Sequence, residues 1–263
     1  MKQSAAFFLA VLVLTQVPAP GAGLEISATR VEGDGNTGVL LARGNVRISD
    51  GLTVLVGAQL VADLRARRAV LTGGRVRSRD GLLEASRIEL TFTAFRITRI
   101  LARQNASIQM RAGVLFAQTV EVRPQEGRLE AFGNVRVFTP PDVVAFGSRL
   151  TYDRATGRLL LEGPVRVQTG QGAVRGGLLE AVEGNQEITV RGGVRIDYLD
   201  LRGRANTAQV FARAQKAILV GGVFVQRGRE ALWADRVTIF YSTRRVVAEG
   251  VRRMVVEEEG GAG

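Results

Sequence analysis

The chain has 263 residues and a formal net charge of +11, with neither cysteine nor histidine. The lack of both residue types excludes disulfides, Cys/His zinc sites and Ser-His or Cys-His catalytic arrangements. Lys2 and Lys216 are the only lysines, so 34 of the 36 basic residues are arginine. The excess of positive charge favours anionic partners such as lipid headgroups, acidic glycans or nucleic acid, although a coding bias towards arginine would explain any single one equally well.

Residues 1–23 resemble an export signal. Lys2 supplies a short positive segment, residues 5–14 an apolar core, and residues 18–23 a small-residue segment suited to cleavage. The apolar run is shorter than the roughly 18–20 residues that span a bilayer. The sequence therefore predicts cleavage after Gly21, Ala22 or Gly23 and an exported mature chain, with an uncleaved anchor helix as the alternative.

A short corner motif recurs along the rest of the chain, a glycine followed by a small residue, valine and arginine. Its copies are Gly44-Asn45-Val46-Arg47, Gly74-Arg75-Val76-Arg77, Gly133-Asn134-Val135-Arg136, Gly163-Pro164-Val165-Arg166 and Gly192-Gly193-Val194-Arg195, with weaker copies at Gly221 and Gly250. With Gln104-Asn105 as a degraded copy, the intervals are 29 or 30 residues. A fixed period of this size predicts an array in which no unit buries its apolar face alone.

Between the corners, apolar and polar residues alternate with period two, as in Val165-Arg166-Val167, and turn signals such as Thr156-Gly157 separate the runs. This pattern is typical of half-buried strands. We therefore expect an all-β domain over residues 24–256, with about sixteen short antiparallel strands, two per repeat. Residues 92–105 break the pattern, and we expect a longer loop or a break in the stack there. We assign no regular structure to the acidic tail, residues 257–263.

The repeat resembles that of the LptA or OstA-like family of periplasmic lipopolysaccharide-transport proteins over residues 44–256. The resemblance lies in Tyr152-Asp153-Arg154-Ala155-Thr156-Gly157-Arg158 followed by Glu162-Gly163-Pro164-Val165, and in a second full copy over residues 234–251. It implies an elongated, twisted, open β-jellyroll whose apolar interior shields acyl chains of lipopolysaccharide or a similar anionic amphiphile. It also implies a periplasmic location, end-to-end homo-oligomers, and partners with related jellyroll domains at the inner and outer membranes. No catalysis and no cofactor are implied.

One continuous apolar stripe could line such a lipid path, because each acyl CH₂ exposed to water costs about 0.8 kcal/mol. The alternative is that the same residues pack together as a closed, dry core. The candidate lining residues are Val46, Ile48, Leu60, Ile88, Leu90, Val120, Val122, Val135, Val137, Leu150, Tyr152, Val165, Val167, Leu179, Val194, Ile196, Val210, Val237 and Ile239.

The arginines of the corners follow an inward valine, so they face the opposite side of the strand. These are Arg47, Arg77, Arg136, Arg166 and Arg195. They fit a solvated face that guards against aggregation, or a surface that holds lipid phosphates. The first mature strand, from Leu24, and the last, over residues 246–256, are predicted docking edges.

Other functions are weakly indicated. Residues 33–38 match the dinucleotide-binding spacing of glycines, but no helix follows, so we interpret them as a turn. Turn aspartates such as Asp63 and Asp153 do not indicate an enzyme. A non-enzymatic β-solenoid scaffold, or an exported protein that binds acidic glycans, shares the period and remains the alternative. Nucleic-acid binding is disfavoured, because the sequence has no local arginine–aromatic cluster.

Overall fold

The computed structural model describes residues 23–78, 81–94, 96–110, 113–140, 142–170, 172–182, 187–211, 214–240, 243 and 245–256. Apart from Gly23, the predicted export signal lies outside the described residues, and so does the acidic tail over residues 257–263. Within the described ranges, no helix is long and apolar enough to cross a membrane.

The all-β prediction is confirmed. One antiparallel sheet holds eighteen strands, most of them ten to fourteen residues long. They are β1 (Glu25–Ser27), β2 (Arg30–Asp34), β3 (Val39–Ser49), β4 (Val54–Asp63), β5 (Arg68–Ser78), β6 (Gly81–Phe92), β7 (Ile97–Met110), β8 (Gly113–Arg123), β9 (Arg128–Thr139), β10 (Val143–Asp153), β11 (Arg158–Thr169), β12 (Gly172–Val182), β13 (Glu187–Tyr198), β14 (Leu201–Phe211), β15 (Lys216–Arg227), β16 (Glu230–Phe240), β17 (Arg245–Glu249) and β18 (Arg253–Val255).

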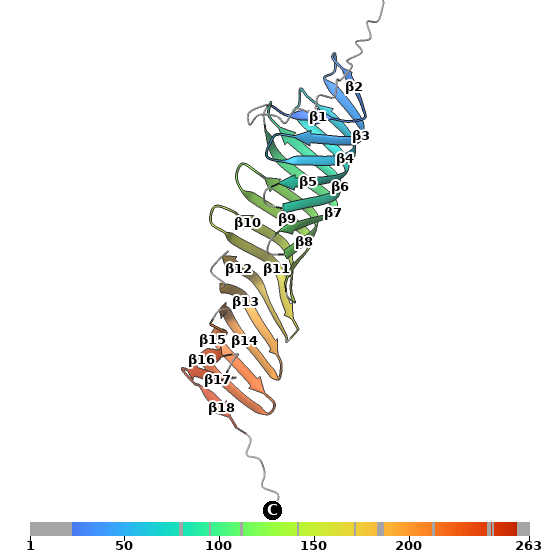
Figure 1. Cartoon of the computed structure of the whole chain (residues 1–263). Coiled ribbons are helices and arrows are strands. Elements are labelled where there is room, and N and C mark those ends of the chain that lie inside the picture. The colour runs from blue at the N-terminus through green and yellow to red at the C-terminus, as the bar shows by residue number, and fades with distance from the viewer. Residues whose placement is uncertain are drawn as a thin grey trace, which may run out of the picture.

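The strands form a simple meander. Every strand from β2 to β16 is hydrogen-bonded to the next one in the sequence, so the molecule grows by one strand at a time into an elongated stack. Figure 1 shows β1–β3 at one end of this stack and β16–β18 at the other. At each end two short strands share one long neighbour: β1 and β2 both pair with β3, and β17 and β18 both pair with β16.

Each recurring glycine motif is a corner in the sheet. The backbone takes positive φ angles there, for example 72° at Gly44 and 47° at Asn45, and the pairing with the next strand shifts between Arg43 and Val46. Such a bulge bends the strand sharply. The bend divides the sheet into two facing halves. We call arm 1 the half that contains β2, β17 and residues 39–43 of β3, and arm 2 the half that contains β1, β18 and residues 46–49 of β3.

The corner leaves little room for side chains. At Gly163, with φ of 97°, a Cβ atom would fall on the hydroxyl of Ser148, which donates a hydrogen bond to the carbonyl of Glu162 at 3.0 Å. Glycine is required here both for the backbone conformation and for the close approach of the neighbouring strand. The recurrence of glycine thus follows from the recurrence of the bend.

Residues 92–105, where we expected an irregularity, contain a turn before β7 and a corner within β7. Gln104 and Asn105 have φ of 65° and 61°, and the register shifts between Arg103 and Ala106, so the degraded motif is a true corner and β7 pairs normally with β6 and β8. The expectation of a break in the stack is therefore wrong. The irregular residues before β7 form a turn that extends beyond the edge of arm 1.

We expect Gly163→Ala to lower the free energy of unfolding by about 2–4 kcal/mol, because it combines backbone strain with a clash against Ser148. The matched control is Gly222→Ala, where φ is 57° and no atom lies within 4 Å of the new Cβ. That substitution carries the backbone cost alone, about 1 kcal/mol. Denaturant unfolding followed by circular dichroism measures both, and equal losses would contradict the proposed packing at the corner.

Candidate functional site

The space between the two arms is lined by apolar side chains from every strand except β2 and β18, which are exposed along their whole length. All nineteen candidate lining residues point into it, as their position on the inner side of each strand requires. Fourteen of them are buried, whereas Val122, Val137, Tyr152, Val167 and Val210 are only half-buried. The half-buried residues lie on β8 to β14, which indicates that the two arms are not equally close along the stack.

From β4 to β7 the space is filled. Most inner side chains near the free edges of the arms are buried here, including Leu55 at 0% exposure and Ile100 at 2%, whereas Met110 at the end of β7 is half-buried. Phe92 and Ile97, beyond them, are buried as well. We call this part the sealed stretch. Candidate lining residues within it, such as Ile88 and Leu90, are buried and pack within the apolar cluster.

A buried carboxylate joins the two arms across the sealed stretch. Asp50 lies in the turn between β3 and β4, at the free edge of arm 2. Its Oδ1 accepts hydrogen bonds from the backbone N–H groups of Leu52 and Thr53, at 3.1 and 2.8 Å. Its Oδ2 accepts a third from the N–H of Ile97, at 3.0 Å, where the turn before β7 leaves arm 1. The residues that interrupt the repeat pattern thus close this end of the inner space.

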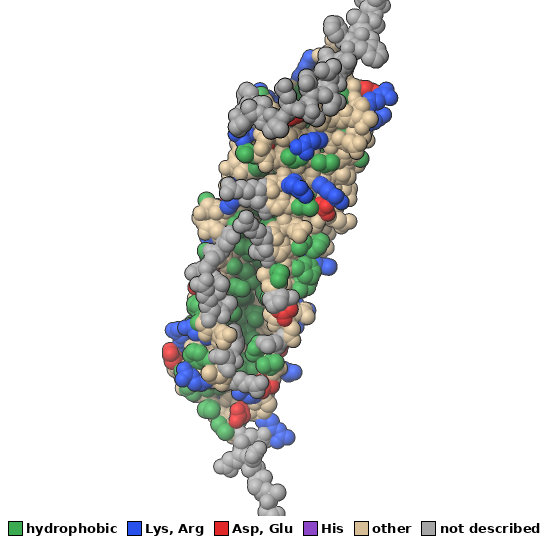
Figure 2. Space-filling view, viewed as in Figure 1, with side chains coloured by type: hydrophobic (Ala, Val, Ile, Leu, Met, Phe, Trp, Pro, Cys, Tyr) green, Lys and Arg blue, Asp and Glu red, His purple; other side chains and the backbone are tan. Residues whose placement is uncertain are grey.

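From β9 to β13 the space is open. Most inner side chains near the free edges are half-buried here, whereas Leu129 on β9 and Ile196 on β13 are buried. The half-buried ones are Val137, Ala145, Tyr152, Leu159, Val167, Val174, Ala181 and Ile188. Behind them lies a floor of buried residues that includes Leu161 and Val165. Figure 2 shows hydrophobic side chains gathered in a hollow over this part of the molecule. We call this part the open stretch.

Side-chain size differs between the two stretches on arm 2 but not on arm 1. At one level of arm 2 the inner residues are Leu55, Val76, Leu83 and Ile108 in the sealed stretch, and Val137, Ala145, Val167 and Val174 in the open stretch. On arm 1 the sealed stretch has small residues as well, Ala62 and Ala69. The smaller residues on arm 2 of the open stretch leave the facing arms with an unfilled gap, which water or a ligand must occupy.

Five of the eight open-stretch residues were not among the sequence candidates: Ala145, Leu159, Val174, Ala181 and Ile188. They lie on the same inner face as the candidates. Strict period-two counting outwards from Leu161, Leu179 and Val190 would have found Leu159, Ala181 and Ile188. The run Leu159-Leu160-Leu161 hid the pattern, because its middle residue is apolar and yet faces outwards.

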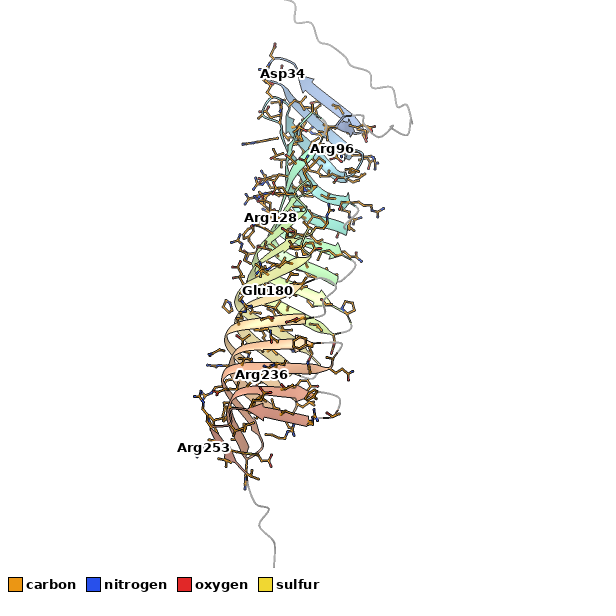
Figure 3. The ribbon with its side chains drawn as sticks, turned by 90° about the vertical axis from the view of Figure 1, so that its left-hand side faces the viewer. Asp34, Arg96, Arg128, Glu180, Arg236 and Arg253 are labelled. Carbon is orange, nitrogen blue, oxygen red and sulfur yellow. The ribbon has the colours of Figure 1, made fainter. Side chains whose placement is uncertain are left out.

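The outer face of arm 1 carries a ladder of ion pairs. Arg128 and Arg149 both contact Glu130, at 2.9 Å, and Arg158 and Arg191 both contact Glu180. Figure 3 shows Arg128, Glu180 and Arg236 at successive levels of the stack. Cross-strand pairs of opposite charge stabilise a sheet, so these arginines have anionic partners within the chain.

Glu121 is the best-shielded carboxylate of this ladder, with 12% of its side chain exposed. Its Oε2 accepts a hydrogen bond from Arg99 at 2.7 Å and its Oε1 accepts one from Arg123 at 2.9 Å. The hydrogen bond from Arg99, with a smaller contribution from Arg123, holds the pKa of Glu121 below its ordinary value despite partial burial. The same contact raises the pKa of Arg99.

The corner arginines lie on the outer face of arm 2, as predicted from their place beside the inward valines. Arg47, Arg136, Arg166 and Arg195 are all exposed. Among the residues that the structure describes, no group of three or more aspartates or glutamates is placed to hold a metal ion. The functional geometry of the molecule therefore consists of an apolar inner space, open from β9 to β13, between two outer faces of different charge.

The fold is that of an elongated, open β-jellyroll. No protein-family model matches the sequence, and no curated protein matches it either. Among solved structures, the chain is similar to LptH of Pseudomonas aeruginosa, described as the LptA homologous periplasmic component of the conserved lipopolysaccharide transport device. The identity is 13% and the TM-score 0.41, and the alignment covers 44% of this chain and 95% of that one. The present stack is thus considerably longer than that protein.

We expect Asp50→Ala to lower the free energy of unfolding by about 2–4 kcal/mol, because it leaves three backbone N–H groups without their acceptor, two of them buried. Asp63→Ala is the matched control, since Asp63 accepts one hydrogen bond, from Ala66, in an exposed turn. That change should cost about 1 kcal/mol. Chemical unfolding measures both, and a loss for Asp50→Ala no larger than the control would show that Asp50 does not hold the arms together.

The ion pairs of Glu121 predict a dependence of stability on pH. Because the folded pKa lies below the unfolded one, the ionised carboxylate stabilises the fold at pH values above the unfolded pKa, near 4.3, and this contribution is lost as pH falls through the folded pKa. Glu121→Gln should therefore destabilise by about 1 kcal/mol at pH 7, and by progressively less below pH of about 4. Unfolding of both proteins from pH 7 to pH 3 tests this, and a constant difference would refute it.

Proposed function

We propose that this protein shelters the acyl chains of lipopolysaccharide, or of a similar anionic amphiphile, during transport between the inner and outer membranes. The observation that supports the proposal is the open stretch, an apolar surface held between two arms with its side chains only half-buried. A water-soluble fold ordinarily buries such a surface. Leaving it accessible is useful to a protein that receives an apolar guest.

The size of the open stretch suits a lipid tail. Five strands, β9 to β13, separated by about 4.7–4.9 Å give an inner surface about 19 Å long. Each CH₂ that an acyl chain buries there contributes about 0.8 kcal/mol. A single tail along the stack would thus gain several kcal/mol without needing any directed polar contact, which is what a carrier of varied lipid tails requires.

The two ends of the stack are suited to join other molecules in line. β2 and β18 are exposed over their whole length, and β18 presents Met254 at 64% exposure. Edge strands offer unpaired N–H and C=O groups that can extend the sheet into a partner. In this proposal the partners are further copies of the chain and related jellyroll domains at the two membranes. The predicted export signal over residues 1–23 supports a periplasmic location for the mature protein in this proposal.

The sealed stretch favours the alternative function, a β-solenoid scaffold or acidic-glycan-binding protein, in one respect. There the inner residues pack against one another and leave no path towards β1. A scaffold would extend this dry packing through the whole stack. The lipid-carrying proposal therefore applies to the open stretch, with the sealed stretch as a rigid stem beside it.

Photo-crosslinking at matched positions separates the two functions. A photoreactive residue at Val167, half-buried in the open stretch, should capture lipid from cells that produce the protein. The same residue at Leu71, which has 0% exposure in the sealed stretch, should capture none. Gel mobility and mass spectrometry of the adducts are the measurements. Capture at neither position, with folded protein in both cases, would favour the scaffold.

A further inference from the structure

One row of side chains crosses the outer face of arm 2 at the level just beyond the corners. Its members are directly opposite one another on consecutive strands from β10 to β15. In order they are Phe146, Arg166, Arg175, Arg195, Arg204 and Phe224. We call these residues the arginine row. Four arginines therefore stand side by side, about 4.7–4.9 Å apart along the stack, with an aromatic ring at each end.

The arginine row is not neutralised within the described part of the chain. Arg166 and Arg195 have no ion pair there, and the nearest carboxylate oxygen to Arg175, in Asp197, is 3.9 Å away. The guanidinium of Arg204 lies over the ring of Phe224, 5.2 Å from its centre. All four arginines are exposed.

The two arms differ in this respect although they belong to the same strands. On arm 1, arginines such as Arg149 and Arg158 contact glutamates on the neighbouring strand. On arm 2, between β11 and β14, each arginine of the row faces another arginine. Like charges directly opposite one another destabilise a sheet. The arrangement costs stability, and among the described residues its only ion pair is the long contact between Arg175 and Asp197. It therefore indicates an anionic partner outside the chain.

The shape of the row narrows the choice of partner. Strands in a sheet rotate by about 20–25° from one to the next, so the row turns by about 60–75° between β11 and β14. It forms an exposed ridge. Single-stranded nucleic acids are bound along positively charged grooves, which a ridge does not provide. A lipid surface, by contrast, adapts to a ridge, and arginines flanked by aromatic rings suit its headgroup region.

We propose that the arginine row docks this protein onto the surface of a membrane that contains anionic lipids. Arg166, Arg175, Arg195 and Arg204 bind lipid phosphates, and Phe146 and Phe224 enter the interface on either side. In this orientation arm 2 lies against the lipid and its free edge, where Leu199 is 61% exposed, reaches the headgroups beside the open stretch. The docking does not depend on an occupied inner space, so it stands or fails separately from the proposed function.

The test uses the mature full-length chain and sedimentation with vesicles of equal parts phosphatidylglycerol and phosphatidylcholine. Replacing Arg166, Arg175, Arg195 and Arg204 by glutamine should weaken binding at least about a hundred-fold, and replacement by lysine should restore most of it. The matched control replaces Arg149, Arg158, Arg191 and Arg236 by glutamine. It removes the same number of positive charges from arm 1 and should weaken binding by less than about ten-fold.

Two further measurements complete the test. Thermal unfolding should show the arginine-row variant to be at least as stable as the wild type, since like-charge repulsion is removed. Phe146→Trp in a Trp233→Phe background should shift its fluorescence to shorter wavelength on anionic vesicles and not on pure phosphatidylcholine. Equal losses in the two glutamine variants, no binding by the wild type, or tighter binding to inorganic polyphosphate or single-stranded DNA than to vesicles would each overturn the proposal.

Discussion

The bend at the middle of each strand is the constraint on which the rest of the molecule depends. The long strands, β3 to β16, are each hydrogen-bonded to the next, so a bend in one must be matched at the same level by its neighbours or the pairing is lost. Gly44, Gly133 and Gly163 satisfy this requirement with positive φ angles. Once the bends are aligned, the sheet becomes two arms, and one side of every strand is committed to the space between them. The period of 29 or 30 residues is the length of two strands with their turns.

Much of this could be predicted from the sequence, because its causes are local. Alternation in segments such as Val165-Arg166-Val167 identifies the inner side of a strand without reference to any other strand. The exception is Gln104-Asn105, which adopts the corner conformation without glycine. Asparagine tolerates positive φ better than most residues, and the neighbouring strands impose the bend in any case. The bend can therefore form at a level where the sequence lacks the glycine motif.

The features of the site could not be predicted, because they arise between residues far apart in the sequence. Whether the inner space is filled depends on the side chains that face each other across the arms. It also depends on Asp50, whose carboxylate binds the backbone of Ile97 forty-seven positions away. The arginine row is equally non-local, since it takes one residue from each strand and only the register between strands assembles it. Neither the filling of the inner space nor the arginine row can be found as a cluster of neighbouring residues in the sequence.

The open stretch and the arginine row lie on opposite sides of the same single-layer sheet, arm 2. In a single-layer sheet, neighbouring residues of one strand serve opposite sides: Val165 and Val167 face the open stretch while Arg166, between them, faces outwards. A surface that binds lipid headgroups and a surface that accepts acyl chains can therefore be only one sheet apart. The same strands, β11 to β13, contribute to both, at the part of the stack where the arms are furthest from closing. A lipid would need to pass only around the free edge of arm 2 to move from one surface to the other.

Because strand alternation alone separates the two surfaces, a shift of register in these strands would exchange valine for arginine and abolish both surfaces together.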